Sequence, residues 1–221
     1  MSEQLPKAII WDMDGVIVDS GRFHFYAWQQ ALAEHGFSFT EAQFRQTFGQ
    51  RNREILLQFL GDRYSPELEQ AISERKEALF RENLRGKAQP LPGVLTWLDR
   101  LKAQGFRHAV ASSGPSQNIE AVIGELGLGY YFDAIVCGES LPAGKPDPTI
   151  FLHAAEMLDT PPSRCVVIED AVAGVEAAHR AGMKCVAVTT TNRPEALRNA
   201  EIVVARLNEL PPDTFERLIG S

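Results

Sequence analysis

The stretch AIIWDMDGVIVDS at residues 8–20 decides how the rest of the chain is understood. It begins as a short apolar run that is typical of a buried strand. Asp12 and Asp14 follow where such a strand would end, and residues two apart in a strand point to the same face. Gly15 then permits a turn that a Cβ atom would hinder. The same letters are also common where a strand simply runs into a turn, so both interpretations stand at this point.

The two aspartates suggest a particular kind of chemistry. Two carboxylates held close together in a low-dielectric pocket repel each other unless a positive charge compensates. Mg²⁺ supplies that charge, and it prefers a few carboxylate oxygens with its other positions left to water and phosphate. The pair Asp12 and Asp14 therefore favours a Mg²⁺ site near the end of the first strand.

The hydrophobic pattern changes to a helical period directly after this strand. Residues 21–86 predict a small helical bundle, with glycines where helices should stop. The expected helix starts are a capping box of Thr40 with Gln43, a cap at Asn52, and Ser65 before Pro66.

From residue 93 onward, short apolar strands alternate with amphipathic helices, which indicates a parallel sheet covered on both faces. The fold class is therefore α/β, a doubly wound parallel sheet with a helical-bundle cap inserted after the first strand. We place the core in residues 1–18 and 88–221 and the cap in residues 19–87. The expected strands are 107–112, 134–137, 165–169, 184–188 and 202–204, and the expected helices are 94–104, 117–127, 148–158 (with Asp147 as cap) and 172–181.

The composition narrows the function classes. The chain has 221 residues, 44% hydrophobic and 23% charged, as in an ordinary globular protein. Its formal charge of −7 argues against binding to nucleic acid or to an anionic membrane surface. Residues 1–6 lack a signal pattern and no apolar run is long enough to span a membrane, so we expect a cytoplasmic protein. We also expect a monomer. Cys137, Cys165 and Cys185 match no zinc spacing and are expected to be free, buried thiols.

In open parallel sheets, ligands bind beyond the carboxyl ends of the strands. Each polar residue there has a structural explanation of its own, as a strand end, a surface lysine or an acid at a helix N-terminus. All of them nevertheless fall on one edge of the predicted sheet. They are Asp12, Asp14, Ser112, Ser113, Lys145 (in the sequence Gly-Lys-Pro-Asp-Pro), Glu169 and Asp170.

These residues resemble the four ordered motifs of the haloacid dehalogenase superfamily of phosphotransferases. The first is similar to residues 12–16, the second to Ser112, the third to Lys145, and the fourth to residues 168–170. The resemblance covers essentially the whole chain, and the bundle at 21–86 is similar to the all-helical cap of that family.

The resemblance implies a role for each of the motif residues. Asp12 is the expected nucleophile that forms an aspartyl-phosphate, and Asp14 is the expected general acid and then general base. Ser112 is expected to hydrogen-bond a phosphoryl oxygen, and Lys145 to neutralise charge on the nucleophile and phosphate. The expected Mg²⁺ ligands are Asp12, Asp14 through its carbonyl oxygen, Asp170, and Glu169 either directly or through water.

Residues of the cap resemble the β-phosphoglucomutase-like branch of the superfamily. The matching positions are Ser20, His24, Trp28, Gly49 and Lys76. In that branch a histidine at the position of His24 is associated with control of the acid/base aspartate, whereas alternatively it is a histidine on a helix surface.

The substrate-binding candidates are Ser20, His24, Arg51, Arg53, Lys76 and Ser113. Neither arginine falls unambiguously at the phosphate-binding position of the mutases. Two alternatives follow: either Arg51 or Arg53 binds a substrate phosphate, or both are surface charges.

The expected function is therefore a Mg²⁺-dependent phosphatase acting on a small phosphorylated metabolite, such as a sugar phosphate. The alternative is a phosphomutase of a hexose phosphate. A phospho-accepting signalling receiver also uses clustered aspartates, Mg²⁺ and a lysine on a parallel sheet, but the helical insertion at 21–86 argues against it. The expected partner is a small phosphate ester, with no nucleic acid and no membrane.

Overall fold

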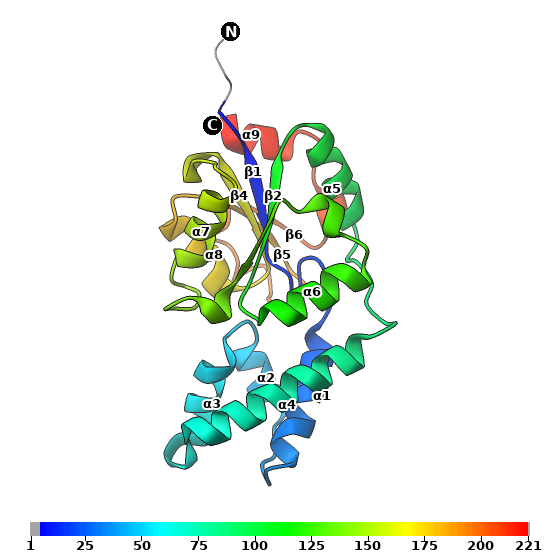
Figure 1. The fold of residues 1–221 in the computed structure, drawn as a ribbon. Helices are drawn as coiled ribbons and strands as arrows, with labels where there is room; N and C mark the ends of the chain where they lie inside the picture. The colour runs from blue at the N-terminus through cyan, green and yellow to red at the C-terminus, as the bar shows by residue number, and fades with distance from the viewer. Residues whose placement is uncertain (1–4, 221) are drawn as a thin grey trace.

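The structure, a computed structural model, describes residues 5–220. Residues 1–4 and 221, which the domain prediction includes, lie outside the described part of the chain. Figure 1 shows a sheet flanked by helices and, beyond one edge of that sheet, a group of helices coloured blue to cyan-green. The fold class expected from the sequence is confirmed, whereas the exact domain boundaries stay a prediction.

The sheet has six parallel strands in the order β3-β2-β1-β4-β5-β6. β1 lies in the middle, and Ile10 is in register with Ala109 of β2 on one side and Val167 of β4 on the other. The strand order reverses at β1, which is where open α/β sheets form their ligand crevice. The strands are β1 (Ala8–Trp11), β2 (Arg107–Ser112), β3 (Ala134–Cys137), β4 (Cys165–Glu169), β5 (Lys184–Val188) and β6 (Ile202–Val204). All strands predicted after residue 93 have their predicted bounds.

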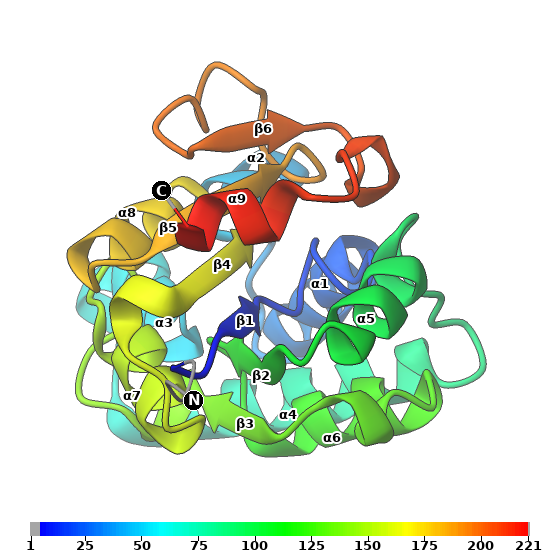
Figure 2. The same cartoon turned by 90° about the horizontal axis from the view of Figure 1, so that it is seen from above.

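Helices cover both faces of the sheet (Figure 2). Alternation along β1 sends Ile9 and Trp11 to one face and Ala8 and Ile10 to the other, so both faces of the strand are buried. The first face packs against α5 (Val94–Ala103), α6 (Ser116–Glu125) and α9 (Thr214–Gly220). The second face packs against α7 (Thr149–Met157) and α8 (Val172–Arg180).

The inserted helices lie beyond the carboxyl ends of the strands (Figure 1). They are α1 (Gly21–Ala33), α2 (Glu41–Thr47), α3 (Asn52–Leu60) and α4 (Pro66–Leu84), and we call them the cap. Buried aromatic side chains such as Trp28 and Phe80 fill the space between them. The apolar interior of the cap is continuous with the core on one face of the sheet, and the cap faces the edge where the predicted site residues gather.

Of the three helix starts predicted for the cap, two are confirmed and one is wrong. The capping box of Thr40 with Gln43 is present, and the Ser65 hydroxyl accepts from the backbone N–H of Leu68. The prediction of Asn52 as a cap was wrong, because Asn52 is already the first residue of α3. Its amide instead donates to Glu77 Oε1 at 2.7 Å, a partner that lies on another helix.

The start of α7 also differs from the prediction. The helix begins at Thr149 with Pro148 just before it, so Asp147 is not its cap. Asp147 Oδ1 accepts from the backbone N–H of Thr149 at 2.9 Å. This bond closes a local turn between Asp147 and Thr149 instead of capping the helix.

Two negative expectations can be compared with the structure of residues 5–220. None of the helices there has the length and apolar character to cross a membrane. All three cysteines are free thiols; Cys165 and Cys185 are buried and Cys137 is half-buried.

Candidate active site

The centre of the site is an ion pair between Asp12 and Lys145. Asp12 directly follows β1, and Lys145 comes from the loop between β3 and α7. Lys145 Nζ donates to Asp12 Oδ1 at 2.5 Å and to Glu169 Oε1 at 2.7 Å. Its side chain is only 5% exposed. One buried ammonium group therefore holds two buried carboxylates from adjacent strands.

The pKa shifts in the site show that its carboxylates are only partly neutralised by positive charge. Burial raises the pKa of Asp12 to about 8, since Lys145 offsets only part of the desolvation and both Glu169 and Asp14 add repulsion. Burial alone would lower the pKa of Lys145, but its attraction to Asp12 and Glu169 raises it above the usual range. Lys145 thus stays charged, while the carboxylates around it are undercompensated.

Three buried acids lie close enough to share one cation. They are Asp12, Glu169 and Asp170, each with a carboxylate oxygen within 4.8 Å of the others. Both oxygens of Glu169 are already in use, because Oε1 accepts from Lys145 and Oε2 accepts from the backbone N–H groups of Asp170 and Ala171. The Glu169 carboxylate is therefore held in place by Lys145 and by the backbone that follows it.

Asp170 carries the clearest sign of a missing partner. Its Oδ2 atom is buried and has no hydrogen-bond partner among residues 5–220. Burial, followed by repulsion from Glu169 and Asp12, raises the pKa of Asp170 well above its ordinary value. An orphaned carboxylate oxygen among excess negative charge fits a hard divalent cation such as Mg²⁺. Asp12 and Asp170 are placed to hold it, with Glu169 as a further ligand or through water.

Two glycines make room for these carboxylates. Gly15 has φ +85°, and a Cβ on it would lie 1.9 Å from Asp170 Oδ2. A Cβ on Gly174, in the first turn of α8, would lie 1.8 Å from Glu169 Oε1. The backbone must therefore approach the acids more closely than any other residue type would allow.

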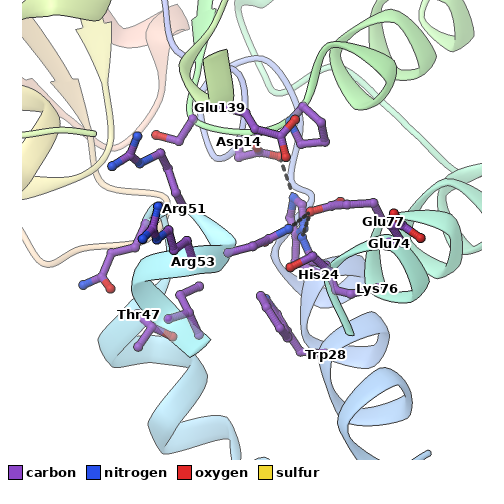
Figure 3. A pocket seen from close by; sticks show the side chains of 18 of the residues that line it. Asp14, His24, Trp28, Thr47, Arg51, Arg53, Glu74, Lys76, Glu77 and Glu139 are labelled. Carbon is purple, nitrogen blue, oxygen red and sulfur yellow. Dashed lines mark hydrogen bonds and ion pairs between the residues drawn. The ribbon is translucent and has the colours of Figure 1, made fainter. Parts of the chain in front are cut away.

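The Asp14 carboxylate points toward His24 of the cap (Figure 3). His24 Nε2, from α1, lies 3.1 Å from Asp14 Oδ1, and the Ser20 hydroxyl donates to the same oxygen. Burial alone would raise the pKa of Asp14, but His24 and then Ser20 favour the anion, so the pKa is lowered. Asp12 and Asp14 thus have pKa values displaced in opposite directions, as expected for two carboxylates with different tasks.

The two serines after β2 lie at the same edge of the sheet. Ser112 is buried, and its Oγ accepts from the backbone N–H of Gly114 at 3.2 Å. Ser113 lines the neighbouring cavity. Because β2 pairs with β1, with Trp11 opposite Val110, both serines lie at the same end of the strands as Asp12.

A cavity of about 660 Å³ lies between the cap and this edge of the sheet (Figure 3). It contains most of the predicted substrate-binding residues. Lining residues from the prediction are Asp14, His24, Arg51, Arg53, Lys76 and Ser113, together with Trp28 and Gly49. Ser20 is fully buried and hydrogen-bonds Asp14, which suits it to orient that acid.

The cap contributes residues that sequence analysis missed. Glu77 is buried beside Lys76, accepting from its Nζ at 2.8 Å, and it also accepts from the Asn118 amide of α6. Arg81 Nη1 donates to Asn118 Oδ1 at 2.9 Å. These bonds join α4 to the core. Nothing in the local sequence marks them, because an acid and an arginine on a helix are usually surface charges.

Comparisons with known proteins agree with this architecture. Residues 6–182 match the family described as haloacid dehalogenase-like hydrolase. The chain is 35% identical to a β-phosphoglucomutase of Bacillus subtilis, over 92% of this chain and 91% of that protein. It is 34% identical to a phosphorylated carbohydrates phosphatase of Thermotoga maritima, over 89% of this chain and 92% of that protein.

A solved structure shows the same fold over nearly the whole length. The crystal structure of a β-phosphoglucomutase from Clostridium difficile superposes with a TM-score of 0.86 at 28% identity, covering 98% of each chain. The sheet order, the inserted helical cap and the family match together show that this chain is an enzyme of the haloacid dehalogenase-like hydrolase family.

Proposed function

We propose that the protein is a Mg²⁺-dependent phosphatase that hydrolyses small sugar phosphates through an aspartyl-phosphate on Asp12. The observation that carries this proposal is the Asp12 carboxylate fixed by Lys145 beside the orphaned oxygen of Asp170, next to a cavity that Asp14 lines. A phosphate ester needs such positioning and charge neutralisation more than elaborate bond chemistry.

In the first step, Asp12 Oδ attacks phosphorus while the bond from phosphorus to the ester oxygen breaks. The departing alcohol oxygen takes the proton of the hydrogen bond between His24 and Asp14, delivered through the Asp14 carboxyl group. Lys145 stays beside Asp12 and offsets the negative charge brought by the phosphoryl group. Mg²⁺, when bound, supplies further neutralisation of the phosphoryl oxygens.

In the second step, water attacks the phosphorus of the aspartyl-phosphate and the bond to Asp12 breaks. Asp14 takes the proton of that water, and its lowered pKa keeps it in the base form that this step needs. Ser112 and Ser113 lie at the neighbouring strand end, where they can donate to phosphoryl oxygens. The products are the free alcohol and inorganic phosphate.

The proposed substrate class rests on the cavity and on the relatives. A volume of about 660 Å³ leaves room for a monosaccharide phosphate, and the cap supplies polar side chains that can meet sugar hydroxyls. The Thermotoga maritima relative is named as a phosphatase of phosphorylated carbohydrates, which agrees with this class.

A phosphomutase is the second candidate, because His24 of the cap touches the proposed acid/base Asp14 and a relative is named a β-phosphoglucomutase. A mutase must exclude water from the aspartyl-phosphate and present a sugar hydroxyl instead. The same Asp12 chemistry would then end in isomerisation and not in release of phosphate.

Phosphate release from a panel of sugar phosphates with Mg²⁺ tests the phosphatase. Asp12→Asn removes the anionic nucleophile with little change of shape, so turnover should fall by about 10³-fold or more. Asp62→Asn, at an exposed cap position, should leave turnover unchanged. Undiminished phosphate release by Asp12→Asn would rule out the proposed nucleophile.

Phosphorus NMR separates the two candidates. The enzyme is incubated with β-glucose 1-phosphate, Mg²⁺ and a catalytic amount of β-glucose 1,6-bisphosphate. A phosphatase accumulates inorganic phosphate. Rapid conversion to glucose 6-phosphate with almost no free phosphate would establish the mutase and overturn the phosphatase.

A further inference from the structure

Arg51 joins the cap to the loop that carries Lys145. Its guanidinium is held by Glu54, with Nε and Nη2 donating to Oε1 at 2.8 and 2.6 Å. The remaining Nη1 donates across the cavity edge to the backbone oxygen of Leu141 at 3.0 Å. Leu141 lies in the core, just before the loop that reaches Lys145. The pair therefore belongs to the cap by sequence and contacts the core by its side chain.

Gly144 shows how closely this pair fits the lysine loop. A Cβ on Gly144 would lie 2.9 Å from Arg51 Nε and 3.0 Å from Glu54 Oε1. Gly144 is not among the glycines with positive φ, so its backbone conformation does not itself require glycine. A side chain at position 144 would therefore require the Arg51–Glu54 pair to shift.

Lys145, which follows Gly144 in the chain, is the residue whose ammonium group donates to Asp12. Gly144 O accepts from the backbone N–H of Asp147 at 3.0 Å, which closes a turn around Lys145. Any movement of Gly144 is therefore passed to the base of the Lys145 side chain, whose ammonium reaches Asp12 and Glu169.

We propose that the Arg51–Glu54 pair is a positioning device that seats the Lys145 loop when the cap lies against the core. Arg51 then acts through Lys145 and not as a ligand of the substrate. Its guanidinium already has Glu54 and Leu141 O as partners, and its side chain is only 20% exposed. Arg53, two residues later, lines the same cavity, but unlike Arg51 it is exposed.

This inference rests on the proposed phosphatase activity, and two substrates separate it from substrate binding. A sugar phosphate presents hydroxyls to the cap, whereas p-nitrophenyl phosphate has neither hydroxyls nor a second anion. If Arg51 positions Lys145, Arg51→Met should lower kcat about tenfold for both substrates with little change in KM. Arg51→Lys should rescue little, because an ammonium cannot reproduce the guanidinium fork.

The matched control is Arg45→Met. Arg45 pairs with Glu41 on the exposed face of α2, within the cap alone, so its loss should leave kcat unchanged for both substrates. A defect of Arg51→Met that is confined to the sugar phosphate, or that appears only in KM, would make Arg51 a substrate ligand and overturn the proposal.

Hydrogen exchange gives a readout that does not depend on turnover. The amide of Asp147 should exchange faster in Arg51→Met than in Arg45→Met, because the turn around Lys145 loses its support. Equal exchange in the two variants would also overturn the proposal. A wild-type enzyme that hydrolyses neither substrate would refute the phosphatase instead, and the exchange comparison would still decide the role of Arg51.

Discussion

The Nε2 atom of His24 lies 3.1 Å from Oδ1 of Asp14, so a helix of the cap reaches the carboxylate that follows the central strand. His24 is stacked on Phe80 with 3.9 Å between ring centroids, which fixes the plane of its imidazole. A residue of the cap thus favours the charged form of a carboxylate in the core.

Removing this imidazole should move the acid limb of the pH–rate profile. Burial raises the pKa of Asp14, and His24 is the largest influence that lowers it. In His24→Ala the pKa of Asp14 should therefore rise, and the base form needed for hydrolysis of the phosphoenzyme should appear only at higher pH. The measurement is kcat for phosphate release between pH 4 and pH 8. His35→Ala, at an exposed position, should retain the wild-type profile, and an unshifted profile in His24→Ala would contradict the expectation.

Mg²⁺ should stabilise the fold through Asp170. Three buried carboxylates lie close together and Lys145 pairs with only two of them, so a bound cation removes repulsion that exists only in the folded chain. At about 100 times its dissociation constant, Mg²⁺ should add roughly 2.7 kcal/mol to the free energy of unfolding. Asp170→Asn should lose most of the resulting rise in Tm, whereas the exposed Glu156→Gln should keep it. A full Mg²⁺-dependent rise in Asp170→Asn would place the cation elsewhere.

Two helical glycines should respond in opposite ways to alanine. At an unobstructed helix position, alanine stabilises by roughly 0.5–1 kcal/mol relative to glycine. Gly124 in α6 has no atom within 4 Å of its added Cβ, so Gly124→Ala should be stabilising. In Gly174→Ala the new Cβ would collide with the Glu169 carboxylate, so Tm and turnover should both fall. Thermal melts and phosphate release measure this contrast, and a stabilised, fully active Gly174→Ala would refute it.

His108 should make the fold sensitive to mild acid. It is fully buried in β2 and accepts from Trp11 Nε1 at 3.0 Å, and burial lowers its pKa to about 4. The unfolded chain, with a histidine pKa near 6.5, binds more protons between these values, so stability falls as pH drops from about 6.5 to 4. The contribution lost is about 3 kcal/mol.

The test for His108 is a comparison of urea unfolding at pH 7 and pH 4.5. His108→Asn keeps an acceptor for Trp11 but cannot gain a proton in this range, so it should lose less stability than the wild type. The difference between the two proteins isolates His108 from the carboxylates that also titrate. Equal losses would show that His108 does not cause the acid sensitivity.

Much of the fold was predictable because its signals are local. The strands after residue 93 have the predicted bounds, since buried parallel strands are short apolar runs set between helices of different period. The gathering of the predicted site residues, from Asp12 to Asp170, could be foreseen for a related reason. Each lies just after a strand or in the loop beside one, and the parallel topology brings these points to one edge of the sheet.

The two helix starts that were wrong show the limit of local signals. Asn52 and Asp147 have the side chains that caps prefer, and both instead bond elsewhere. For Asn52 the partner is Glu77, 25 residues away on α4, and no sequence pattern states that the two helices meet there.

The sequence by itself determined the parallel sheet, the helical insertion and the group of acids, serines and lysine at the strand ends. Only the tertiary structure decided that Arg51 bonds Leu141, 90 residues away, that Glu77 bonds Asn118, and that Asp170 keeps a buried oxygen without a partner. The physical reason is range: hydrophobic period and turn chemistry act over a few residues, whereas these contacts depend on how the cap packs against the core.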